Sequence, residues 1–273
     1  MKRFFRTYLP FSRAGLQSAM AYRANFVFFL IGEIFKCFVM FFLWKAVFVS
    51  SGSETFMGFT MENMIVYVFI SFLTGYLSFS DGAFALGEEI VDGSVSMRLI
   101  KPCSFDMCFL FQELGNKVIN YSIMFVPIVV GVEIYRYVAT GAVCFNIVNF
   151  LLFFVSLQLA YFINFYFNVI YGFLAFFLKN LWGTGLIKDV IVGFLSGATI
   201  PLAFMPNALR IVLTYLPFSS LSYTPVMLYM GMYDVKQIVS SMLLQIVWLT
   251  IFVLISKLIW KSATKHLCVQ GGW

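Results

Sequence analysis

The sequence has few charged residues. Asp, Glu, Lys and Arg make up 11% of its 273 residues, whereas a soluble domain carries about 25%. Hydrophobic residues account for 62%, and 35 of them are phenylalanine. One soluble core cannot bury so much apolar surface, but a lipid bilayer accommodates it. The composition therefore excludes an ordinary soluble protein and predicts an integral membrane protein.

Short motifs of common enzyme classes are also missing. There is no Gly-x-Ser-x-Gly, no His-Glu-x-x-His and no Gly-Lys dipeptide, so the chain has no phosphate-binding P-loop. The sequence therefore predicts no catalytic residues and no cofactor held by this chain. If ATP drives its activity, ATP and Mg²⁺ must bind to a partner subunit.

Metal ligands are equally scarce. The chain has one histidine and five cysteines without a CxxC pair, whereas a zinc site needs several ligands at close spacing. We therefore expect no metal site, and free thiols that behave as small apolar groups. These residues are His266, Cys37, Cys103, Cys108, Cys144 and Cys268.

Six apolar segments are long enough to cross a bilayer, which takes about 20 residues of helix. The expected fold is an all-α integral membrane protein with six transmembrane helices in a single domain, residues 1–273. The predicted spans are Asn25–Phe48, Glu62–Phe79, Val118–Tyr135, Ile147–Phe177, Leu186–Phe204 and Ile238–Ile259.

Two further segments are expected to associate with the membrane without crossing it. Residues 1–23 mix arginines with Phe and Leu, which predicts an amphipathic helix along the inner surface, broken at Pro10. Residues 206–230 are apolar but interrupted by Pro217 and Pro225, which predicts a re-entrant or extracellular element before the last helix.

The basic residues predict the orientation. With the N-terminus inside, thirteen Lys and Arg residues fall in inner segments and four in outer ones, as the positive-inside rule requires. An even number of helices then leaves both termini in the cytoplasm. Because topology explains the net charge of +6, we expect no nucleic-acid partner.

The predicted inner segment 81–117 is rich in charge. Acidic residues open a short helix that Gly93 can end, and Pro102 stops the next element. Two interpretations remain open: a solvated connector, or a docking surface for a cytosolic partner. The candidate contact residues are Glu88, Glu89, Ile90, Asp92, Gly93, Arg98, Leu99, Lys101 and Pro102.

Uncharged polar residues recur at three- and four-residue steps along one face of the fourth span. Inside a bilayer such side chains either join helices by hydrogen bonds or line a path for substrate. Both roles stay open, with helix packing favoured. The residues are Gln158, Tyr161, Asn164, Asn168 and Tyr171.

Two smaller features lie within the spans. Glu33 and Lys36 are three residues apart in the first span, where they can neutralise each other or serve a proton relay. Gly193 and Gly197 form a GxxxG pattern in the fifth span, which permits a close helix contact with another subunit.

Short motifs gather in two stretches of the chain: Glu88-Glu89-Ile90-x-Asp92-Gly93, Leu99-Ile100-Lys101-Pro102, Leu114-Gly115, Ser196-Gly197-Ala198-Thr199-Ile200-Pro201-Leu202, Met205-Pro206, Leu216-Pro217-Phe218 and Tyr223-Thr224-Pro225. These stretches resemble the ABC-2 type permeases, specifically the branch of about 270 residues usually paired with an ATPase and a second permease. Length, helix count and motif order agree over nearly the whole chain, although Cys103 replaces a more usual aliphatic residue.

The resemblance implies a role for each segment. Residues 1–23 would be the family's elbow helix, 81–117 the cytoplasmic coupling loop that contacts ABC ATPase subunits, and 206–230 the re-entrant element. It also implies two permeases, as a homo- or heterodimer, in a bacterial cytoplasmic membrane.

The sequence therefore predicts a permease subunit of an ATP-driven exporter that moves an amphipathic or hydrophobic substrate, such as a peptide, drug or lipid. The alternative is a stand-alone secondary transporter or channel that uses Glu33 and Lys36. A membrane scaffold without transport is a third possibility.

Overall fold

The protein is almost entirely helical in its computed structural model, which describes residues 2–21, 23–52, 55–95, 97, 104–178 and 180–267. The elements are α1 (Lys2–Ala21), α2 (Arg23–Ser51), β1 (Thr55–Phe56), β2 (Phe59–Thr60), α3 (Met61–Ser78), α4 (Gly82–Val91), α6 (Phe105–Asn120), a π-helical turn (Tyr121–Phe125), α7 (Val126–Thr140), α8 (Ile147–Gly172), a 3₁₀ turn (Phe173–Phe176), α9 (Trp182–Leu195), a second 3₁₀ turn (Leu202–Phe204), α10 (Asn207–Tyr215), α11 (Tyr223–Met230) and α12 (Val235–Leu267).

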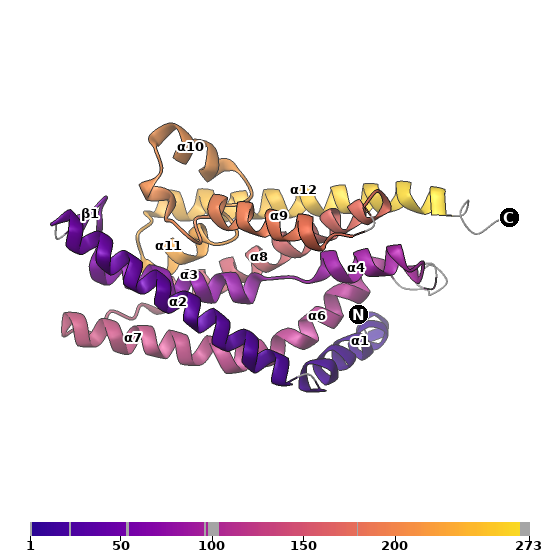
Figure 1. Ribbon diagram of the computed structural model, residues 1–273, viewed down its shortest axis with the longest axis horizontal. Helices are drawn as coiled ribbons and strands as arrows, with labels where there is room; N and C mark the ends of the chain where they lie inside the picture. The colour runs from indigo at the N-terminus through magenta and orange to yellow at the C-terminus, as the bar shows by residue number, and fades with distance from the viewer. Residues whose placement is uncertain are drawn as a thin grey trace.

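The long helices share one direction, along the long axis of the molecule (Figure 1). Helices α1 and α4 and the last turns of α12 lie at one end, on the right of the figure, and the β1–β2 hairpin and α10 lie at the other. Five stretches are long and apolar enough to cross a membrane: Ile31–Ser51, Met61–Val91, Phe105–Thr140, Ile147–Phe176 and Val235–Ala263. The predicted helical multi-span fold is thus confirmed.

The fifth predicted span is not one helix. Helix α9 has 14 residues, which makes it about 21 Å long and too short for a hydrocarbon core of about 30 Å. The chain then turns at Gly197, whose φ of +79° ends the helix, and Pro201 precedes a short 3₁₀ turn. The prediction of a continuous helix over 186–204 is wrong, because α9 ends at Leu195 and the chain continues in turns and bends.

The third span is longer than predicted. Helix α6, the π-helical turn and α7 run without interruption from Phe105 to Thr140, whereas hydropathy placed the span at 118–135. The π-helical turn at Tyr121–Phe125 lies just before Pro127. Proline has no N–H to donate to the carbonyl four residues earlier, so the helix widens locally. The predicted inner segment 81–117 therefore contains two helices: α4 forms its first part, and the start of α6 forms its last part.

Helix α1 continues through Pro10, so the predicted break is wrong. The helix lies along α6, where the rings of Tyr8 and Phe111 stack with centroids 5.3 Å apart and the Tyr8 hydroxyl accepts a hydrogen bond from the Ser104 amide. This tertiary packing offsets the hydrogen bond that proline removes. Phe4 also contacts α6, with its ring centroid 5.8 Å from that of Phe111, whereas Phe5 is exposed. The position of α1 along the inner membrane surface stays a prediction.

Segment 206–230 forms two short helices joined by a turn. Helix α10 is mostly exposed and projects from the end of the molecule opposite α4 (Figure 1), whereas every residue of α11 from Tyr223 to Tyr229 is buried. Gln245 of α12 supports the turn by donating to the Ser220 carbonyl at 2.9 Å. A carbonyl group in this non-helical turn thus has a hydrogen-bond partner from a neighbouring helix, as buried backbone groups require.

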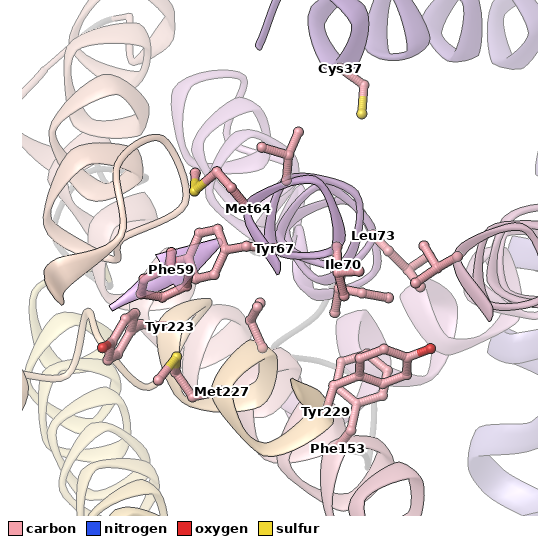
Figure 2. Close-up of a cluster of buried hydrophobic side chains, with 14 of the residues drawn as sticks. Cys37, Phe59, Met64, Tyr67, Ile70, Leu73, Phe153, Tyr223, Met227 and Tyr229 are labelled. Atoms are coloured by element: carbon pink, nitrogen blue, oxygen red, sulfur yellow. The ribbon is translucent and has the colours of Figure 1, made fainter. Parts of the chain in front are cut away.

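The main hydrophobic core surrounds α3. Tyr67, Ile70 and Leu73 of α3 meet Phe153 of α8 and Met227 of α11 (Figure 2). The Tyr67 hydroxyl donates to the Gly197 carbonyl at 2.6 Å. Because α3 is enclosed by its neighbours, a change in its position must be transmitted to the helices around it.

Candidate functional site

Helix α4 carries the best-defined candidate contact surface. The chain bends at 79–81, α4 begins at Gly82, and Gly93 adopts a φ of +79° just beyond its end. Leu86 and Gly87 are buried, whereas Glu88, Val91 and Asp92 are exposed. An apolar side chain flanked by two carboxylates suits a contact with a polar rim.

The other predicted contact residues divide into two groups. Glu89 and Ile90 are partly buried and Gly93 is exposed. The remaining predicted contacts lie outside the described residues: Arg98, Leu99, Lys101 and Pro102.

Asp92 has a stable negative charge. Its side chain accepts a hydrogen bond from the Ser94 hydroxyl and another from the Ser94 amide at 2.8 Å. These hydrogen bonds lower the pKa of Asp92 below its ordinary value, because they favour the ionised form. The end of α4 therefore keeps its acidic character throughout the physiological pH range.

Helix α4 rests closely on its neighbours at three glycines. A Cβ at Gly172 of α8 would lie 3.0 Å from the Ala83 carbonyl oxygen, and one at Gly185 of α9 would lie 2.8 Å from the Phe84 ring. A Cβ at Gly87 would lie 2.7 Å from Leu181. Such close approach leaves α4 little freedom to move without α8 and α9.

A groove of about 490 Å³ runs between α4 and the start of α9. Glu88 and Asp92 lie on one side of it, and Asn180 and the exposed Trp182 on the other. Sequence reasoning did not connect 180–182 with the α4 surface, because the two segments are about 90 residues apart in the sequence and meet only in the fold.

The polar face of α8 contacts other parts of the protein at every predicted position. Gln158 donates to the Tyr121 hydroxyl at 2.7 Å, and Tyr161 donates to Glu113 at 3.1 Å. Asn164 donates to the Ser78 carbonyl at 2.8 Å, and Tyr171 donates to the Thr184 hydroxyl at 2.6 Å. Asn168 accepts from Lys188 at 2.5 Å and, within α8, donates to the Asn164 carbonyl at 2.9 Å. Such contacts are typical of helix packing, and a substrate path along this face stays a prediction.

Two charged residues of α6 were not recognised from the sequence. Lys117 is 8% exposed and donates to the carbonyls of Leu77 and Phe79, and Glu113 accepts from Ser80 at 2.9 Å. Sequence reasoning placed both in the inner segment 81–117, interpreted as either a solvated connector or a docking surface. Their spacing of four residues, typical of neighbours on a helix, was the signal that could have identified them.

Glu33 and Lys36 form an ion pair with a distance of 2.7 Å. The Lys36 side chain is 67% exposed and lies on the outer surface of α2, whereas Glu33 is 18% exposed. The pair thus neutralises itself within one helix and faces the surroundings of the protein.

Gly193 and Gly197 do not form a shared helical face. Gly193 is in α9, but Gly197 lies beyond the helix end in a left-handed conformation and is buried. A Cβ there would meet Leu202, Tyr223 and the Tyr67 hydroxyl within about 3.3 Å. Gly197 is therefore buried inside the protein and does not share a helical face with Gly193, and a permease contact in this region stays a prediction.

An apolar hollow of about 560 Å³ lies on α7 and the start of α8, near the end opposite α4. Val129, Ile134 and Phe150 are among its lining residues, and Glu133 supplies its one charged group. In the part of the chain that the structure describes, no group of three His, Cys, Asp or Glu side chains could hold a metal ion.

Comparison with known proteins gives one result. A family model described as ABC-2 family transporter protein matches residues 34–271. No curated protein matches the chain with significant similarity. The matched range includes α4, the polar face of α8, α11 and all of α12.

Proposed function

Because this chain belongs to the ABC-2 family of transporter proteins, whose members are multi-pass membrane components of ABC transporters, we propose that it is the permease subunit of an ATP-driven exporter. A separate ABC ATPase subunit binds ATP and Mg²⁺ and docks on α4. The single observation that carries this proposal is the exposed acidic and apolar surface of α4 at Glu88, Val91 and Asp92.

The groove beside α4 supports a docking role. Its acidic side attracts a basic group on the partner, and the exposed Trp182 ring adds apolar area of the kind that anchors protein interfaces. The close packing of Gly172 on Ala83 means that force applied to α4 reaches α8 directly.

The proposed topology places α4 and both termini in the cytoplasm of a bacterial cell. Helix α1 is the elbow at the inner membrane surface, and α10 and α11 are the re-entrant element near the outer surface. Helix α9, the turn at Gly197 and the segment up to Pro206 together complete a sixth crossing. Two permeases, identical or different, assemble with two ATPase subunits in the lipid bilayer.

The proposed substrate is amphipathic or hydrophobic: a peptide, a drug or a lipid. The hollow near Glu133 supports this class, since apolar side chains line it and one carboxylate lies at its edge. The ion pair of Glu33 and Lys36 gives no support to a stand-alone carrier, because both charges are satisfied by each other on the surface of α2.

Charge reversal on α4 tests the proposal. In the variant Glu88→Lys, Glu89→Lys, Asp92→Lys, we expect at least a tenfold loss of ATPase co-purification, because like charges placed across an interface cost several kcal/mol. Glu62→Lys serves as the control, because Glu62 is exposed at the start of α3 near the other end of the molecule. Normal ATPase recovery with the triple variant, at equal membrane insertion, would refute docking on α4.

A further inference from the structure

The end of α3 is held by side chains from two other helices. The last carbonyls of a helix have no partner within it. At the end of α3, Lys117 of α6 donates to the carbonyl oxygens of Leu77 at 2.8 Å and Phe79 at 2.5 Å. Asn164 of α8 donates to the carbonyl of Ser78, which lies between them, at 2.8 Å. Three consecutive carbonyls at the bend into α4 are thus bound from outside α3.

The start of α4 is held from the same side. Ser80 is 3% exposed, and its hydroxyl donates to Glu113 at 2.9 Å while accepting from the Gly82 amide at 3.2 Å. A Cβ at Gly82 would lie 3.5 Å from the same Glu113 carboxylate. Glu113 is one helical turn before Lys117, so one face of α6 binds both sides of the bend at 79–81.

Tyr161 of α8 connects these two charges. Its hydroxyl donates to Glu113 at 3.1 Å, and its ring centroid lies 5.1 Å from the Lys117 ammonium group. The charges of Glu113, Lys117 and Asp81 also interact electrostatically. Buried charges are retained where several partners stabilise them together, and removal of one leaves the others unsatisfied.

We infer that Lys117, Glu113 and Asn164 are positioning residues that lock the bend between α3 and α4, so that movement of α4 is passed to the membrane-spanning helices. This inference rests on the proposed function, in which a partner ATPase moves α4. A short connection such as 79–81 would otherwise act as a hinge that absorbs the motion. With the lock in place, α4 and α3 move as one body together with α6 and α8.

Spin-label distances in the complex with its ATPase test the inference. All native cysteines are replaced, and one label pair at Val91→Cys and Leu258→Cys reports on the α4 end. A second pair at Val138→Cys and Val235→Cys reports on the opposite end; all four positions are at least half exposed. In the otherwise unchanged protein, ATP with vanadate shifts both distances.

The double variant Glu113→Gln, Lys117→Met removes both buried charges and keeps the side-chain volumes. We expect ATP with vanadate to change the distance of the α4 pair as in the unchanged protein, and to leave the distance of the opposite pair unchanged. The single variant Asn164→Ala keeps both charges and should reduce the change in the distance of the opposite pair by at least half. The single variant Lys117→Arg keeps the N–H donors and should retain that change in full. The control variant Glu33→Gln, Lys36→Met removes an ion pair on the surface of α2 and keeps every hydrogen bond of the bend, so it should leave the changes in both distances intact.

The possible outcomes separate the inference from the proposed function. If the distance of the opposite pair changes as much in the double variant and in Asn164→Ala as in the unchanged protein, the lock is overturned but docking on α4 is not. No shift of either pair in the unmodified complex, or no bound ATPase, overturns both. If the double variant does not fold, the result with Asn164→Ala decides.

Discussion

Gly15 of α1 and Gly115 of α6 lie where the two helices cross in direct backbone contact. A Cβ on Gly15 would collide with the Gln112 carbonyl, and one on Gly115 would collide with the Ser12 carbonyl. Glycine lets the backbones of two helices approach more closely than any other residue does. The pair therefore fixes α1 on α6, the helix that also carries Lys117.

Alanine at Gly115 should release α1. The backbone of Ser12 must move to admit the methyl group, and such overpacking costs about 1–3 kcal/mol. We expect a lower melting temperature in detergent and faster proteolysis of α1. Gly131→Ala is the matched control, since a Cβ there meets no atom within 4 Å. Equal melting temperatures for the two variants would contradict the close contact.

Leucine at Gln245 should destabilise the turn before α11. Gln245 is fully buried on α12, where it accepts from the Ser156 hydroxyl at 3.0 Å and donates to the Ser220 carbonyl at 2.9 Å. Its loss leaves buried polar groups unpaired, which costs about 1–3 kcal/mol each. Thermal unfolding should show this loss, whereas Thr250→Val, an exposed change on the same helix, should show almost none.

Phenylalanine at Tyr229 should loosen α11 from α7. The Tyr229 hydroxyl donates to Glu133 at 2.6 Å, and Arg136 binds the same carboxylate oxygen at 3.2 Å. A hydrogen bond to a charged group contributes about 1.5–3 kcal/mol. We expect faster hydrogen exchange in α11 with Tyr229→Phe but not with Tyr137→Phe, which is exposed on α7. Identical exchange in both would contradict this role for Tyr229.

Hydropathy alone predicts most of the spanning helices. Helices α3, α8 and α12 are predominantly apolar over their whole length, so their approximate positions follow from the sequence. The continuous helix expected over 186–204 fails because average hydropathy does not register the turn at Gly197, where α9 has ended although the chain stays apolar. The sequence did not predict that the third span begins in α6, because charged residues such as Glu113 and Lys117 are typical of a loop when their buried partners are unknown.

The α4 surface was accessible to sequence reasoning, whereas the bend behind it was not. Acidic residues followed by Gly93 indicate a short exposed helix from local pattern. The contacts of Lys117 with Leu77 and of Asn164 with Ser78 join residues 40 and 86 positions apart. Such contacts depend on how α3, α6 and α8 are arranged, and no short sequence window contains that information.

The central claim is that α4 faces the cytoplasm from a protein that crosses the membrane. Labelling of single cysteines with a membrane-impermeant maleimide in intact cells tests it most directly, in a chain without native cysteines. Val143→Cys, 80% exposed between α7 and α8 at the far end of the molecule, should react at once. Val91→Cys on α4 should react only after the cells are permeabilised. Reaction of Val91→Cys in intact cells would contradict the account.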